Sequence, residues 1–135
     1  MKNPLRFLVA LTLGTALLAM TGCNTVSVSS TQAIGTPVYP PTDPAAVQIL
    51  HAPPTRPHIR LGEVRAEPAS TSTPAPEIAT AIQKEAAKLG ADAVVIVYDQ
   101  TQIVGAVVNG PWWGRSVQGI TGRVVIAVAI KYTGP

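Results

Sequence analysis

Three kinds of side chain in this 135-residue sequence are suited to chemistry or recognition: one cysteine, two histidines and two adjacent tryptophans. The thiol of Cys23 is a nucleophile that a lipid can alkylate. His51 and His58 carry imidazoles that can bind a divalent ion. Trp112 and Trp113 offer large apolar rings of the kind that anchor protein contacts. Only Cys23 has neighbours that point to one particular chemistry.

Cys23 follows a charged start (Lys2 and Arg6), an apolar run over 7–20 and two small residues. This order resembles a bacterial lipoprotein signal, although Met20 stands where such signals usually carry leucine. The apolar run is shorter than the roughly 20 residues that cross a bilayer. The resemblance implies cleavage before Cys23 and covalent lipid, such as palmitate, on the new first residue. An ordinary secretory signal and a retained membrane helix are the alternatives.

Asn24, rather than an aspartate, follows the cysteine. By resemblance to enterobacterial sorting signals, this favours the outer membrane, with the protein facing the periplasm. Each buried methylene of an acyl chain contributes about 0.8 kcal/mol, so two or three chains would hold the protein durably at the membrane.

Removal of 1–22 changes the charge and the sulfur content. Lys2 and Arg6 leave, so eight basic and seven acidic residues remain and the net charge falls from +3 to about +1. No basic run with interleaved aromatic residues exists, which gives nucleic-acid binding no support. Without methionine or a cysteine pair, soft-metal sites, thiol redox chemistry and internal disulfides are excluded.

The two histidines are weak candidates for a metal site. His51 and His58 bracket a proline-rich turn, but their separation matches no recognised ligand spacing, and a site would need a carboxylate such as Asp43 or Glu63 as a third ligand. We therefore expect exposed loop histidines and no cofactor other than the covalent lipid. No nucleophile elbow, metalloprotease helix or phosphate-binding glycine loop is present, so we expect no enzymatic activity.

The sequence predicts three parts: a signal peptide at 1–22, a lipidated flexible tether at 23–37 and a small domain at 38–135. Residues 24–36 are rich in Ser and Thr and short of large apolar side chains, which is typical of a tether. Alternation and turn residues predict one helix and several strands. The expected strands are 46–50, 59–66, 93–98, 102–108 and 117–132, and the helix is 75–89. The fold class is α+β, with one helix packed on a small, mostly antiparallel sheet.

The helix and the last strand carry the clearest patterns. One apolar stripe on the helix would face the sheet: Ile78, Ala79, Ile82, Ala86 and Leu89. Glu85 can pair with Lys88 one turn later, and Gly90 is expected as a left-handed cap. Residues 124–130 are apolar on both faces, which predicts a central strand whose core partners are Val, Ile, Leu and Ala.

Asn109–Gly114 has the glycine and proline content of a hairpin loop. Its two indoles admit two interpretations. They can bind a partner together with Arg115, or they can close the end of a core that has no phenylalanine. In the first case the protein is a binding or sensing module for an envelope protein or for peptidoglycan. A self-assembling protein that forms a homo-oligomer through strand edges, and a divalent-metal-binding lipoprotein, are the alternatives.

The run from Lys88 to Ile96 (KLGADAVVI) joins the helix to a strand, and 61–64 (LGEV) lies in an earlier strand. Both resemble small bacterial envelope domains, among them the lipoprotein that senses stress for the Rcs phosphorelay and ring-forming YbjQ-type proteins. The resemblance covers about 45–132 and implies a fold and a possible ring, but no catalytic residue. The Rcs sensor carries cysteines after this strand, whereas 98–108 has none. Its disulfide-dependent behaviour is therefore not implied here.

Overall fold

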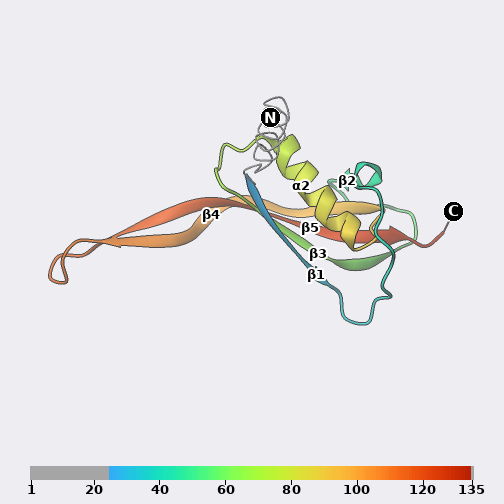
Figure 1. The fold of residues 1–135 in the computed structure, drawn as a ribbon, viewed down its shortest axis with the longest axis horizontal. Helices are drawn as coiled ribbons and strands as arrows, with labels where there is room; N and C mark the ends of the chain where they lie inside the picture. The colour runs from blue at the N-terminus through green and yellow to red at the C-terminus, as the bar shows by residue number, and fades with distance from the viewer. Residues whose placement is uncertain (1–24, 135) are drawn as a thin grey trace, which may run out of the picture.

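Five strands and one long helix make up most of residues 25–134, the part of the chain that the computed structural model describes. The strands form one sheet in the order β1-β3-β5-β4-β2, in which every neighbouring pair is antiparallel except β2 and β4. Helix α2 packs on one face of the sheet (Figure 1). The predicted α+β fold is confirmed. The elements are β1 (Val26–Gln32), a 3-10 turn η2 (Pro44–Ala46), β2 (Gln48–Leu50), β3 (His58–Pro68), α2 (Ala75–Lys88), β4 (Ala93–Asn109) and β5 (Ser116–Tyr132).

Helix α2 begins and ends where its sequence predicts. Pro74 and Pro76 lie at its start, where a missing N–H costs nothing. Gly90 ends it with a φ of 77°. A Cβ at Gly90 would lie 2.6 Å from the Cβ of Tyr39, so the position needs glycine for both its backbone angle and its lack of a side chain. The predicted ion pair between Glu85 and Lys88 is confirmed.

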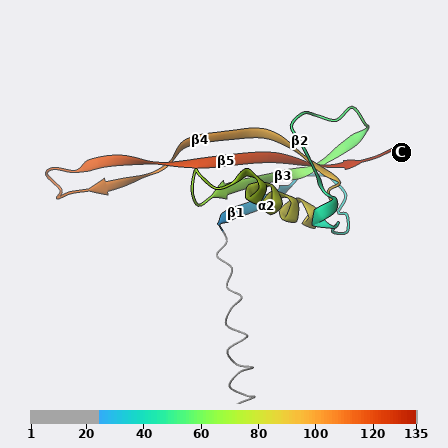
Figure 2. The same ribbon diagram turned by 90° about the horizontal axis from the view of Figure 1, so that it is seen from above.

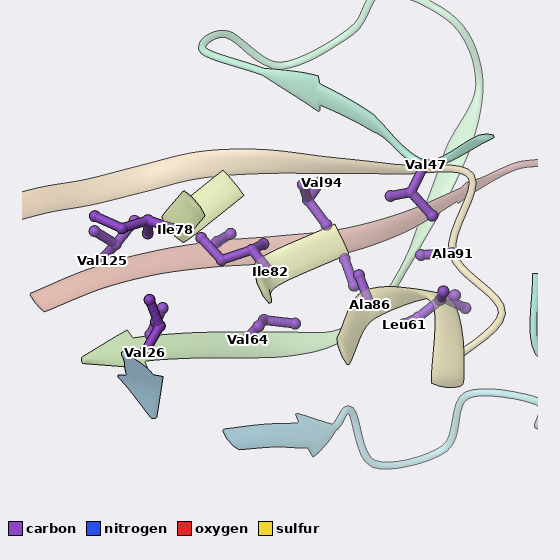
Figure 3. Close-up of a cluster of buried hydrophobic side chains, with 14 residues drawn as sticks. Val26, Val47, Leu61, Val64, Ile78, Ile82, Ala86, Ala91, Val94 and Val125 are labelled. Carbon is purple, nitrogen blue, oxygen red and sulfur yellow. The ribbon is translucent and has the colours of Figure 1, made fainter. Parts of the chain in front are cut away.

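The core lies between α2 and the sheet, and it consists of Val, Ile, Leu and Ala as predicted. Figure 3 shows Ile78 and Ile82 of the helix pointing at Val64, Val94 and Val125 of three strands. Strand β5 is central, as its apolar pattern predicted. The connection between β2 and β3 crosses the other face of the sheet, on the side away from α2 (Figure 2).

The prediction of a flexible tether is wrong over Val26–Gln32, which forms edge strand β1 and pairs with β3 from Val26↔Pro68 to Gln32↔Gly62. Val26 is buried, Val28 packs against the core and Ser30 donates a hydrogen bond to Glu85 of α2, while Ser27, Ser29 and Thr31 are exposed. A strand at the edge of a sheet needs only this thin apolar face, so a Ser/Thr-rich composition does not exclude it.

Strand β4 is longer than predicted, whereas β5 (Ser116–Tyr132) agrees with the predicted 117–132 within one residue. The two segments expected at 93–98 and 102–108 form one strand, because Asp99 to Gln102 continue the ladder with β5. Two bulges, at Val97 and Val104, interrupt the register. Each bulge adds a residue that shifts the alternation of side chains between faces. In the sequence, Asp99 to Gln102 therefore resemble a loop, because they are polar and the apolar alternation before them is out of phase with the alternation after them.

The paired strands β4 and β5 extend far beyond the rest of the molecule (Figure 1). Strand β3 accompanies β5 only as far as the pair Ala66↔Val125, and β2 accompanies β4 only as far as Leu50↔Val95. Beyond those points β4 and β5 pair only with each other among the described residues. We call residues 100–122 the arm and the remaining described residues the body.

Candidate contact surface on the arm

The two tryptophans lie at the tip of the arm and are exposed. Trp112 is 79% exposed and Trp113 is 73% exposed. Their ring centroids are 5.4 Å apart and the planes are nearly perpendicular, at 88°. The interpretation that these indoles close the core is wrong, because the tip lies beyond every other strand of the sheet (Figure 1).

A tight glycine turn presents the indoles. Gly110 has a φ of 104°, and a Cβ there would lie 2.5 Å from the carbonyl oxygen of Gly114. The amide of Gly114 donates a hydrogen bond to the carbonyl of Pro111 at 3.0 Å. Arg115 is exposed beside the turn, so the three predicted contact residues are together at the tip.

The arm also exposes aliphatic side chains behind its tip. Cross-strand pairing places Ile103, Val108 and Val117 on the face that continues the helix side of the sheet. Val107 and Ile120 lie on the other face. The exposed large apolar residues of the arm, each 41% to 79% exposed, are Ile103, Val104, Val107, Val108, Trp112, Trp113, Val117 and Ile120. Exposed apolar side chains gathered in one part of a protein are typical of contact sites, so the arm is a candidate contact surface.

Arg115 is the only charged residue from 100 to 122. Natural proteins usually protect an exposed strand edge with lysines, prolines or inward-pointing charges, because such an edge pairs readily with another strand. Both long edges of the arm lack these charges. The arm is therefore apolar on its faces and unprotected by charge along its edges.

A cavity of about 350 Å³ lies where the arm meets the body. We call it the basal cavity. Its walls come from the first half of α2, the end of β2 and the base of the arm. They are mostly apolar, with Ile49, Ala79, Ile82 and Ile96 among them, while His51, Asp99 and Arg123 supply the polar groups.

Asp99 and Arg123 form a two-pronged ion pair across β4 and β5. The guanidinium donates from Nε to Oδ1 at 2.8 Å and from Nη2 to Oδ2 at 2.7 Å. These hydrogen bonds lower the pKa of Asp99 and raise the pKa of Arg123, outweighing the opposite effect of burial. The sequence alone does not indicate this pair, because only the strand register, which sets Asp99 opposite Val125 and Thr101 opposite Arg123, makes the two side chains diagonal neighbours.

The two histidines do not form a common site. His51 lines the basal cavity, whereas His58 lines a second cavity, of about 400 Å³, with Val95 and Val128. His58 places its Nδ1 2.8 Å from the carbonyl oxygen of Arg56. Within residues 25–134 no three His, Cys, Asp or Glu side chains come together in a group that could hold a metal ion.

Cys23 and the predicted signal peptide lie outside the described residues. The first described residues, Thr25 and Val26, show where the chain enters the body. Thr25 donates a side-chain hydrogen bond to Glu77 in the first turn of α2, and Val26 begins β1. In the described part of the chain, no helix combines the length and the apolar character needed to cross a membrane.

Comparison with known proteins gives a likeness of fold. No protein-family model matches the chain, and no curated protein matches its sequence. A crystal structure of the Francisella virulence factor FvfA superimposes with a TM-score of 0.50 and 13% sequence identity, covering 77% of this chain and 96% of that chain. At this identity the likeness shows a shared α+β fold and nothing about activity.

Proposed function

We propose that this protein is a lipid-anchored protein of the bacterial envelope that works by contact, as a binding or sensing module without catalytic activity. The observation that carries the proposal is the arm, whose tip exposes Trp112 and Trp113 on an almost uncharged ribbon. Exposed tryptophans with an arginine beside them are typical of residues that dominate binding energy. An envelope protein and peptidoglycan are the partner classes that an outer-membrane, periplasm-facing location would offer.

The anchor would hold the body close to the bilayer. Only Asn24 and Thr25 separate Cys23 from the first residue of β1. An extended chain spans at most about 3.6 Å per residue, so Val26 would lie within roughly 11 Å of the lipidated residue. A body held this closely cannot move far from the membrane. The arm is the part of the molecule that extends farthest from the body (Figure 1).

A crosslinking pull-down from intact envelopes tests the contact surface. The native protein is compared with the Trp112→Ala, Trp113→Ala double variant at equal expression. A second double variant, Ile34→Ala, Val38→Ala, is the matched control, because it also removes two exposed apolar side chains, 104% and 84% exposed, but from the body. We expect all three to have the same melting temperature and only the tryptophan variant to lose its crosslinked partners. Retention of the same partners in that variant would contradict the proposal.

The anchor has its own test. Cys23→Ser removes the thiol to which lipid would be attached, so we expect this variant to lose incorporation of labelled palmitate and to leave the membrane fraction. A Thr25→Ala variant, two residues away, should keep both. Membrane retention of Cys23→Ser would contradict lipid anchoring while leaving the contact surface untouched.

A further inference from the structure

We propose that the partner of the arm is the arm of a second copy of this chain. The two β4 strands would pair antiparallel about a two-fold axis, and the tip of each arm would enter the basal cavity of the other copy. This inference rests on the proposed function, in which the arm is the contact surface, and it specifies the occupant of that surface.

The first step is the free edge of β4. Strand β2 covers this edge only as far as Val95, and from Tyr98 to Asn109 the edge has no strand beside it among the described residues. The backbone N–H and C=O groups of alternate residues point outward along an uncovered edge. A second strand would satisfy them with about one hydrogen bond per paired residue.

The second step excludes a lipid bilayer as the occupant. Hydrocarbon would cover the apolar faces of the arm, but it would leave the edge N–H and C=O groups without partners, at a cost of several kcal/mol each. Water satisfies the edges and leaves the faces exposed. A β-strand partner supplies the edge with hydrogen bonds and sets its own side chains beside those along the edge, so it also covers part of the exposed apolar surface.

The third step is the match of the arm with itself. The bulge at Val104 increases the local twist of the ribbon, and an identical ribbon has the same twist at the same place. We set Ile103 opposite Ile103 of the second copy and leave the bulged Val104 of each copy unpaired. Thr101 then lies opposite Ala106 of the second copy. Cross-strand partners place both residues on the helix side of the sheet, so the faces agree.

The fourth step is the position of the cavity. The same register sets Tyr98 opposite Asn109 of the second copy, an overlap of about 40 Å at 3.3 Å per residue. The turn that follows Asn109 of the second copy then reaches the end of β2, where Ile49 and His51 line the basal cavity. The cavity volume of about 350 Å³ lies in the range of pockets that hold small ligands, which is ample for one indole.

The fifth step is the surface that pairing would bury. A standard interface buries roughly 800 Å² on each partner. The indole that enters the cavity brings about 150–250 Å². It would supply about a quarter of the requirement, and the paired edges with the aliphatic side chains along them would supply the remainder. With the two docked tips and the paired β4 edges together, the interface of the dimer thus reaches the area of a stable interface.

The symmetry also suits a shared membrane. A two-fold axis that joins two edges into one antiparallel sheet stands normal to the sheet and leaves both helices on the same side. Thr25 bonds to Glu77 of α2, so both chains enter on that side. Two anchors in one leaflet would therefore be compatible with the pair, and confinement to the leaflet would raise the effective concentration of the arms.

A cysteine scan of the arm in intact envelopes tests the register. Cys23 is the only native cysteine, so once it carries lipid the introduced thiol is the only free one. We expect Ile103→Cys to form a disulfide-linked dimer by itself. Thr101→Cys and Ala106→Cys should form a dimer only when the two variants are expressed together.

Three other outcomes are distinguishable. Self-linking at every position would indicate parallel arms, linking through cysteines on β5 would indicate pairing along the β5 edge, and no linking would indicate unpaired arms. Each of these outcomes would overturn the proposal.

Filling the cavity tests the docking of the tip. Ala79→Trp would occupy the basal cavity from within its own chain, whereas Lys84→Trp adds the same ring to the exposed face of α2. In sedimentation of the full chain in detergent, we expect the native protein and Lys84→Trp to be dimers. Ala79→Trp and the Trp112→Ala, Trp113→Ala variant should be monomers. A dimeric Ala79→Trp variant, or a monomeric native protein, would overturn the proposal.

The two tests separate this inference from the proposed function. Loss of other envelope proteins from the tryptophan variant, with no arm-to-arm disulfide in the native background, would refute the pairing and keep the contact surface. Should the pull-down also be unchanged, the contact surface itself would be refuted.

Discussion

Strands β4 and β5 run through both the body and the arm, yet their side chains have opposite surroundings in the two regions. In the body, Val125 and Ala127 of β5 lie under α2 and are at most 3% exposed. In the arm, Val117 of the same strand is 68% exposed. The difference is helix α2, which covers β5 in the body, and strand β3, which pairs with β5 only as far as Val125, whereas β4 accompanies β5 in both regions. An apolar strand residue becomes part of a core only where another layer covers it.

Charge divides the two regions as well. Ion pairs occur on the body, among them Lys131 with Asp92 and Arg65 with Glu67, while the arm carries only Arg115. A two-stranded ribbon alone is marginally stable in water. The body therefore accounts for the stability of the fold, and the arm carries surface that is available for contact.

The largest expected difference between the regions is at their glycines. Gly90→Ala should destabilise the protein by about 2–4 kcal/mol, because it combines left-handed strain with a clash against Tyr39 and the backbone of Pro40. Gly114→Ala at the tip should change stability by less than about 0.5 kcal/mol, since nothing lies within 4 Å of its added Cβ. Urea unfolding of both variants measures the difference. Equal midpoints would mean that the helix-to-strand turn is not the constraint described.

A matched pair of valines gives the next largest effect. Val64 is fully buried and Val117 is 68% exposed. Val64→Ala should destabilise by about 2 kcal/mol through lost burial and a residual cavity. Val117→Ala should cost less than about 0.5 kcal/mol. The comparison is made by thermal melting of both variants, and a costly Val117→Ala would show that the arm contributes to folding of the monomer.

The smallest effect lies at the junction of the two regions. Arg123 holds the pKa of Asp99 below its ordinary value, so the pair stabilises the fold at neutral pH, and this contribution disappears as the pH falls through the lowered pKa. Because Asp99 is 39% exposed, solvent screening keeps the contribution below about 1 kcal/mol.

Melting temperatures measured from about pH 7 down to about pH 2 check this expectation. Asp99→Asn should melt slightly lower at neutral pH and converge with the native protein in acid. A difference that grows on acidification would have the wrong sign for this ion pair.

The sequence predicted correctly those features that depend on the residue pattern of a single element. The stripe on α2, the turn at Gly90 and the two-sided apolar pattern of β5 each carry a periodicity that burial imposes, and all three were predicted. The hairpin loop at the tip was also predicted. These features depend on local geometry and on the composition of one segment.

The features that the sequence did not reveal depend on pairing between distant segments. Strand β1 is stabilised by β3, whose partner residues lie 30 to 42 positions along the chain. The continuity of β4 is hidden by its two bulges. The tryptophans are exposed because β4 and β5 extend beyond the body. The sequence did not predict this extension, because it indicated two separate short strands in place of β4. The basal cavity requires four elements to come together.

The order of the strands also governs when the protein can fold. Strand β5 is the centre of the sheet and comes last among the described elements. On a ribosome, β3 and β4 would be complete while the strand that joins them was still being made. Helix α2 would then have no finished surface to pack on. A nascent chain of this design cannot close its sheet until Tyr132 has been added.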